Sequence, residues 1–230
     1  MKIKKLNALF YLVISCSKDF KQKTPFKPFK QIFIQAGKVR ELHLEEAMLR
    51  KTLSDNLLIS YRKNLKQNRL NEQKQFFGML NKNFISRLKR KHKVILPFLS
   101  EIDSKKANKY IDKSKNNIKK LLNQGTIKKR QLHELRKRLK ILDYNIKSLT
   151  SGNKKSLAKK SVLPVLLGKW HDNQVMLAHL NKEIKSRKIN LKEIHYLEKV
   201  RMKISSGNEV LLNKINYAIR TSEYLQKLNQ

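Results

Sequence analysis

Apolar and polar residues recur with helical periodicity between residues 132 and 149. At about 100° per residue, the apolar positions share one face of a helix, and they are Leu132, Leu135, Leu139, Leu142, Ile146 and Leu149. The opposite face carries His133, Arg136, Lys137, Lys140 and Lys147. An apolar face needs a core to cover it. The basic face repeats its donors along one line, a spacing suited to a row of negative charges, so this helix indicates a polyanion as ligand.

The same periodicity predicts further helices in the first part of the chain, over about residues 2–17 and from about 30 to 93. In the first of these we place Leu6, Leu9, Phe10 and Val13 toward the core and Lys4, Ala8, Tyr11 and Ser15 away from it. Two prolines within residues 24–28 are expected to prevent a helix there. Softer breaks are predicted near Ser54 and Asp55 and at residues 68–71, and Pro97 is expected to close the first half.

The second part of the chain is predicted to be helical as well. Gly125 suits the end of one helix and Thr126 the N-cap of the next. Residues 150–155 form the clearest linker, and Ser206 with Gly207 is expected to turn the chain before its last helix. The predicted helices cover about residues 104–123, 127–149, 164–186, 191–204 and 211–225.

Composition agrees with an all-α fold and limits the kinds of partner. The 230 residues include only 6 Gly and 4 Pro, and 40% are apolar, which favours long helices around a sizeable core. The chain holds 54 Lys and Arg against 17 Asp and Glu, a net charge of +37. Such self-repulsion destabilises a compact fold unless counter-ions or an anionic partner relieve it. Nucleic acid, polyphosphate and an anionic membrane surface are the three candidates.

Cysteine usage and the first residues bear on the compartment. Cys16 is the only cysteine, so no disulfide can form within the chain and no cysteine metal cluster exists, which suits a reducing cytosol. Basic residues followed by the apolar residues 6–14 and Cys16 are also typical of a bacterial lipoprotein signal. The competing interpretation, an amphipathic helix, is favoured by the repeat described next. No run of about 18 apolar residues occurs, so we expect no transmembrane segment. Cysteine usage leads us to expect a cytoplasmic protein.

Two segments of the sequence recur. Residues 2–6, KIKKL, are similar to residues 138–142, RLKIL, and residues 36–49 align without gaps on residues 167–180. The longer alignment pairs Gly with Gly, Lys with Lys and Leu with Leu, and it places Arg40 opposite His171. Because both pairs run in the same order, we expect one domain over residues 1–230 built from two related helical halves, 1–100 and 101–230.

These repeated segments resemble the conserved histidine α-helical domain (CHAD) family. Residues 132–140, LHELRKRLK, resemble its His-x-x-Arg-x-x-x-Lys/Arg helix, and residues 167–172, LGKWHD, resemble the Leu-Gly-x-x-(Arg/His)-Asp helix that follows. Residues 36–41, AGKVRE, resemble the second element again, so the similarity covers nearly the whole chain. It implies two four-helix bundles related by a pseudo-two-fold axis, with a basic surface between them that binds inorganic polyphosphate.

One element of the family pattern has no counterpart. In the register that sets Lys4 opposite Lys140, the first-half His-x-x-Arg element would precede Met1. Either the chain is a shortened form, or its first-half site relies on Lys2, Lys4 and Lys5.

The chemistry of polyphosphate suggests which residues bind it. The ligand offers oxygens but no bases, so Arg forks, Lys charges and a His that gains a proton suffice. We expect His133, Arg136, Lys137 and Lys140 to contact it, with Lys147 at the margin. The alternative is a solvated basic helix face, the usual fate of lysine-rich stripes.

Two further groups are weaker candidates. Arg40 and His171 are each followed by an acid, and each is expected either near the phosphates or in an ordinary ion pair, whereas Trp170 is expected in the core. In the dense basic run over residues 87–93, the secondary candidates are Arg87, Lys89 and Arg90, which would attract an anion from a distance.

Catalysis is not expected. His171 and Asp172 are similar to the metal-binding pair of HD-type phosphohydrolases, but the sequence offers no further ligand set, no phosphate-binding glycine loop and no base placed beside Cys16. The hypothesis is therefore a non-catalytic polyphosphate-binding domain that needs no cofactor or metal. The alternative is a nucleic-acid-binding protein, although no helix-turn-helix, zinc finger or RNA-binding sheet motif is readable. A module for acidic proteins or anionic lipid is a third possibility.

Overall fold

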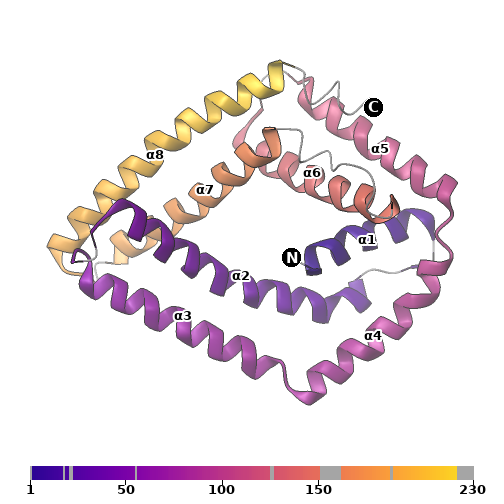
Figure 1. The fold of residues 1–230 in the computed structure, drawn as a ribbon, viewed down its shortest axis with the longest axis horizontal. Helices are drawn as coiled ribbons and strands as arrows, with labels where there is room; N and C mark the ends of the chain where they lie inside the picture. Colours follow the sequence, from indigo (N-terminus) through magenta and orange to yellow (C-terminus); the bar gives the residue numbers. More distant parts are fainter. Residues whose placement is uncertain are drawn as a thin grey trace. The chain divides into compact units, whose positions relative to one another are not determined.

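The structure, a computed structural model, describes residues 2–17, 19–20, 23–54, 56–124, 127–150, 162–186 and 189–221. These residues form helices and no strand, which confirms the all-α prediction (Figure 1). No described helix combines the length and the apolar character needed to cross a membrane. The helices are α1 (Lys2–Cys16), α2 (Lys23–Thr52), α3 (Ile59–Met79), α4 (Lys82–Ser100), α5 (Ser104–Leu122), α6 (Lys129–Leu149), α7 (Leu163–Ser186) and α8 (Leu191–Arg220).

The chain divides into two compact units. Unit 1 comprises Met1–Gln31, Lys82–Gly168 and Lys214–Gln230, and unit 2 comprises Ile32–Asn81 and Lys169–Asn213. Each unit therefore takes segments from both predicted halves of the sequence, and α2, α7 and α8 each contribute residues to both units. The division into halves at residue 100 stays a prediction from the repeat.

Unit 1 is built around α1, α5 and α6, which pack against one another (Figure 1). Leu12 and Cys16 of α1 contact Ala107 of α5 in one buried cluster, while Phe10 and Val13 belong to a second cluster with aromatic neighbours. The prediction that Ala8 faces away from the core is wrong, because its exposure is 0%. Since α1 is covered on more than one side, its buried face is wider than a single stripe.

Unit 2 has its own core, formed by α2, α3, α7 and α8. Its buried members come from all four helices and from the turns beside them, and they are Leu49, Leu58, Tyr61, Leu65, Met176, Leu180, Ile189, Leu197, Val200 and Ile204. This cluster holds the polar groups described below in a nearly water-free setting.

The prolines interrupt the helices less than predicted. Helix α2 begins at Lys23 and continues past Pro25 and Pro28, and α4 continues three residues past Pro97. Position 25 lies in the first turn, where backbone N–H groups have no helical partner. An interior proline costs about 3 kcal/mol. Here Phe26, Phe29 and Phe98 lie beside these prolines and pack against the buried cluster that is formed by Phe10, Val13, Phe20 and Ile95. This packing offsets that cost.

Two other predicted breaks are also absent. Helix α3 runs unbroken through residues 68–71 and ends only at Met79, and α8 is continuous through Ser206 and Gly207. Asn and Gly disfavour a helix by only about 0.7–1 kcal/mol relative to Ala, so packing on either side prevails. Buried Ile204 and Asn208 flank Gly207 in this way.

Other boundaries agree with the sequence. Helix α2 ends at Thr52 and α3 begins at Ile59, which confirms the break near Ser54. The predicted bounds of α5, α6 and α7 lie within two residues of those observed. Gly125, Thr126 and residues 151–155 of the predicted linker lie outside the described residues.

Candidate polyanion-binding surface

Helix α6 in unit 1 separates an apolar face from a basic one, as its sequence predicts. Its four central leucines, Leu132, Leu135, Leu139 and Leu142, are no more than 3% exposed. Burying each such side chain contributes about 1.5–3 kcal/mol, which fixes the rotation of the helix about its axis. Around the basic face, Lys137 is exposed and His133 and Lys140 are half-buried. We call His133, Arg136, Lys137 and Lys140 the α6 basic face.

Arg136 lies deeper than its neighbours on this face, because only 8% of it is exposed. A guanidinium held near the core loses hydration, and it then gains more from a charge-assisted hydrogen bond than an exposed lysine does. Arg136 therefore marks the border between the α6 basic face and the core of unit 1.

His133 experiences the positive charge of its neighbours. Its pKa lies below the ordinary value of 6.5, first because the ring is partly buried and then because Lys137 and Arg136 repel an added proton. Glu134 opposes this effect. The ring is therefore neutral at pH 7, and it can donate one hydrogen bond to an oxyanion without adding to the local charge.

Lys147, expected at the margin, is engaged within its own helix. Its Nζ lies 2.6 Å from Oδ2 of Asp143, one turn earlier, and Arg138 forms a similar pair with Glu134. The ion pair partly neutralises Lys147, so its charge is less available to a ligand than that of Lys137.

Helix α1 brings two more predicted residues into unit 1. Lys4 is half-buried and Lys5 is exposed, both in the first turns of α1, which packs against α6. No acidic residue occupies the first turn of α1. The positive end of the helix dipole and these lysines therefore act in the same direction.

The secondary candidates lie on α4, also in unit 1. Arg87 Nη2 donates to Gln31 Oε1 at 3.5 Å, and its guanidinium stacks 5.0 Å from the ring centre of Phe84. Lys89 and Arg90 are exposed. These side chains can contribute to the field around unit 1, whereas only Arg87 is held by neighbouring groups.

Arg40 and His171 belong to unit 2. Arg40 Nη2 lies 3.4 Å from Oδ2 of Asp172, so α2 and α7 are joined by an ion pair between the two repeated segments. His171 is half-buried, and the neighbouring Trp170 is 3% exposed, which confirms its place in a core. Among the described residues of unit 2, Lys38 pairs with Glu72 and Arg69 with Glu46.

Unit 2 also contains a buried polar network that the sequence did not reveal. Glu45 is 2% exposed, accepts a hydrogen bond from the Tyr61 hydroxyl and lies with Oε2 3.0 Å from Nδ1 of His179. Glu41 Oε2 lies 3.7 Å from Nε2 of the same ring. The one sequence signal is that Glu41 and Glu45 are four residues apart on a helix and so share a face. No group of His, Cys, Asp and Glu among the described residues is arranged to hold a metal ion.

The excess charge is divided unequally between the units. Unit 1 contains 36 of the 54 Lys and Arg residues and 7 of the 17 Asp and Glu residues, a formal charge of +29, and unit 2 carries the remaining +8. The α6 basic face, the start of α1 and the basic run of α4 all belong to the more positive unit.

Comparisons of the chain with protein-family models, with curated proteins and with solved structures give no match.

Proposed function

We propose that the chain binds inorganic polyphosphate through the α6 basic face in unit 1, without catalysing a reaction on it. The observation that carries this proposal is the concentration of +29 of the +37 net charge in that unit. A polyanion that neutralises this charge removes self-repulsion from the folded state, and the release of its own counter-ions adds to binding.

The α6 basic face supplies ordered donors for such a chain of phosphates. Arg136 offers a planar fork at the edge of the core, Lys137 and Lys140 offer ammonium groups within two helical turns, and neutral His133 offers an N–H donor. Burial is the main cause of the lowered pKa of His133, and Lys137 and Arg136 add to it because both repel a proton on the ring. Phosphate oxygens placed among them would turn that repulsion into attraction.

The resemblance to the CHAD family supports the same ligand, and we include its architecture in the proposal. Helices α1 to α4 lie within residues 1–100 and α5 to α8 within residues 101–230, so each predicted half contains four of the described helices. The family's two pseudo-symmetric four-helix bundles are part of the proposal by resemblance alone, since each compact unit draws its helices from both halves.

A competition experiment tests the ligand. Labelled long-chain polyphosphate is displaced from the full chain at about 0.15 M salt by unlabelled polyphosphate, single-stranded RNA or duplex DNA, matched in charge concentration. We expect polyphosphate to compete at least tenfold better than either nucleic acid, about 1.4 kcal/mol. Equal competition, or stronger competition by RNA or DNA, would favour the nucleic-acid alternative.

A variant pair tests the site. Lys137→Ala with Lys140→Ala should weaken polyphosphate binding by tenfold or more, and Arg136→Ala with Lys140→Ala should weaken it further. The control is Arg138→Ala with Lys120→Ala, which removes the same charge from exposed positions of unit 1 off this face. Circular dichroism verifies that each variant is folded. Equal losses in the control would show that diffuse charge binds the ligand.

A further inference from the structure

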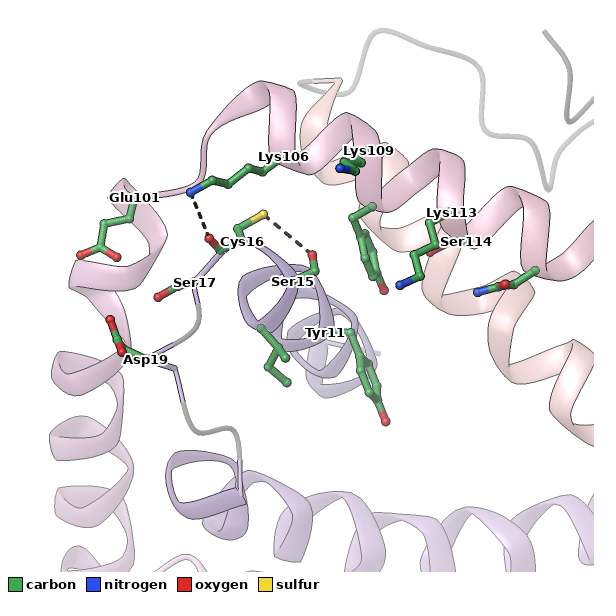
Figure 2. Close-up of a pocket in the computed structure, with 13 residues that line it drawn as sticks. Tyr11, Ser15, Cys16, Ser17, Asp19, Glu101, Lys106, Lys109, Lys113 and Ser114 are labelled. Atoms are coloured by element: carbon green, nitrogen blue, oxygen red, sulfur yellow. Dashed lines mark hydrogen bonds between the residues drawn. The ribbon is translucent and has the colours of Figure 1, made fainter.

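A cleft in unit 1 lies between α1 and α5, and none of its lining residues comes from α6. Its volume is about 970 Å³. One wall is the last two turns of α1 with the residues that follow, and the other is a face of α5 (Figure 2). The side chains that matter here are Tyr11 and Ile14 on the first wall and Lys109, Tyr110 and Lys113 on the second.

Two ammonium groups on the α5 wall are available to an anion. Lys109 and Lys113 are exposed, are four residues apart and therefore lie one above the other on the helix. Neither forms an ion pair with any residue that the structure describes. Lys106, one turn earlier, differs from them because its Nζ donates to the backbone oxygen of Cys16 at 3.5 Å. An anion that entered the cleft would therefore meet Lys109 and Lys113.

The α1 wall offers an aromatic and apolar surface. Tyr11 is 42% exposed and Ile14 is 38% exposed, so both present apolar surface to the cleft. Tyr110 is half-buried, and its pKa is raised, first by burial; Ser114 and Asn145 oppose the shift, and the nearby Tyr11 adds a smaller rise. Two tyrosines thus lie near each other, and the exposed ring of Tyr11 can stack against a flat group.

The other end of the cleft is acidic. Figure 2 shows Asp19 and Glu101 together at one end with Ser17, and Tyr11 and Lys113 toward the other. A long polyanion lying along the cleft would meet two carboxylates, and the resulting repulsion disfavours it. The arrangement instead suits a short ligand with one anionic end, whose hydroxyl or amino groups could donate to the carboxylates.

We propose that the α1/α5 cleft binds an aromatic phosphate ester, with its phosphate group at Lys109 and Lys113 and its flat ring against Tyr11. This site is separate from the α6 basic face and takes a different class of anion. Mononucleotides and flavin phosphates share the required chemistry, so both serve as probes.

Calorimetric titration of the full chain at about 0.15 M salt tests the chemistry. The probes are adenosine 5′-monophosphate and riboflavin 5′-phosphate, each compared with its phosphate-free form and with ribose 5-phosphate, which has no aromatic ring. At least one probe should bind tenfold more tightly than both comparison compounds, and the tighter of the two identifies the nucleotide or the flavin class. Equal binding of ribose 5-phosphate would overturn the proposal, as would the failure of both probes to bind.

Variants test the location. Lys109→Gln with Lys113→Gln should weaken the probe at least tenfold, and Tyr11→Leu should weaken the aromatic phosphate but not ribose 5-phosphate. Lys105→Gln with Lys120→Gln is the matched control, since both residues are exposed on α5 outside the cleft. Lys137→Ala with Lys140→Ala should leave probe binding unchanged, which separates this site from the polyphosphate surface. Equal loss in the control pair, or loss in the α6 variant, would refute the location.

Discussion

Tyr61 donates a hydrogen bond to a carboxylate that is almost completely buried in unit 2. The tyrosine is 4% exposed and packs among Leu49, Leu65 and their neighbours, while its acceptor Glu45 is 2% exposed. Burial, followed by the charge of Glu45, raises the pKa of Tyr61 far above its usual value, so the phenol keeps its proton and remains a donor. The other oxygen of Glu45 faces His179. Two donors therefore compensate for the lost hydration of this carboxylate.

Replacing Tyr61 by phenylalanine removes one of these donors and preserves the packed ring. A hydrogen bond to a charged group contributes about 1.5–3 kcal/mol, and its loss leaves a carboxylate oxygen less well satisfied, so we expect a loss of about 2 kcal/mol. For a chain of this length, each kcal/mol lowers Tm by roughly 2–4 °C. Urea and thermal unfolding, followed by far-ultraviolet circular dichroism, measure both quantities.

The control is Tyr196→Phe. Tyr196 packs partly buried against the same cluster, and its hydroxyl has no hydrogen-bond partner among the described residues, so the change should cost less than about 0.5 kcal/mol. If Tyr61→Phe is no more destabilising than Tyr196→Phe, the carboxylate does not depend on the phenol, and the account of this network is wrong.

Three other predictions follow from single residues. The hydrogen bond with Glu45 raises the pKa of His179 above 6.5. The protonated ring therefore contributes its full stability below about pH 6.5, and this contribution is lost as the pH rises through the raised pKa. A plot of Tm against pH should show this fall, and His179→Gln should remove it. Bound phosphates would raise the lowered pKa of His133, so polyphosphate affinity should increase as the pH falls from about 7.5 to 5.5. The increase should be roughly tenfold for each unit by which the pKa differs between bound and free protein. An affinity that does not change with pH, or a pH dependence that is the same in His133→Asn, would contradict this. Gly207→Ala should stabilise α8 by about 0.5–1 kcal/mol in urea unfolding, because the added methyl group meets no atom within 4 Å; destabilisation would refute the reasoning.

Local periodicity was sufficient to predict the four buried leucines of α6, because every fourth or third residue of one helix faces the same neighbour. It did not predict that Asn145 is buried or that Leu149 is 37% exposed. The fate of the prolines and of Gly207 was not predictable in this way. The free energy that these residues cost a helix is a local property. The packing that offsets the cost of the prolines joins Phe26, Phe29 and Phe98 to one cluster from separate parts of the chain, so local sequence does not reveal it. Ala8 was misplaced for a related reason, since a small side chain carries little information about which face of a helix is covered.

The candidate site, too, could be predicted only in part from the spacing of residues along the helix. The shared face of His133, Lys137 and Lys140 follows from spacing alone, and the Lys147 ion pair with Asp143 was readable as a pair four residues apart. The depth of Arg136 depends on how α6 packs against other helices, which spacing does not reveal.

Contacts between residues that lie far apart in the sequence could not be predicted from residue spacing. Arg40 and Asp172 are 132 positions apart, and Glu193 of α8 accepts a hydrogen bond from the Ser60 backbone N–H at the start of α3, at 2.8 Å. Next to that contact, Leu58 adopts a left-handed conformation with φ 61° while its side chain is buried. A β-carbon makes this conformation unfavourable for leucine, so only the assembled core of unit 2 accounts for it.

The position of Cys16 gives the chain an intrinsic probe of local opening. It is the only cysteine, it lies at the end of α1 against α5, and it is 8% exposed. Burial protects this thiol, so the rate at which a small alkylating reagent modifies it depends on local opening around the end of α1 and on access through the α1/α5 cleft, which Cys16 lines. The native sequence therefore allows the dynamics of one helix pair to be followed by mass spectrometry without introducing a label.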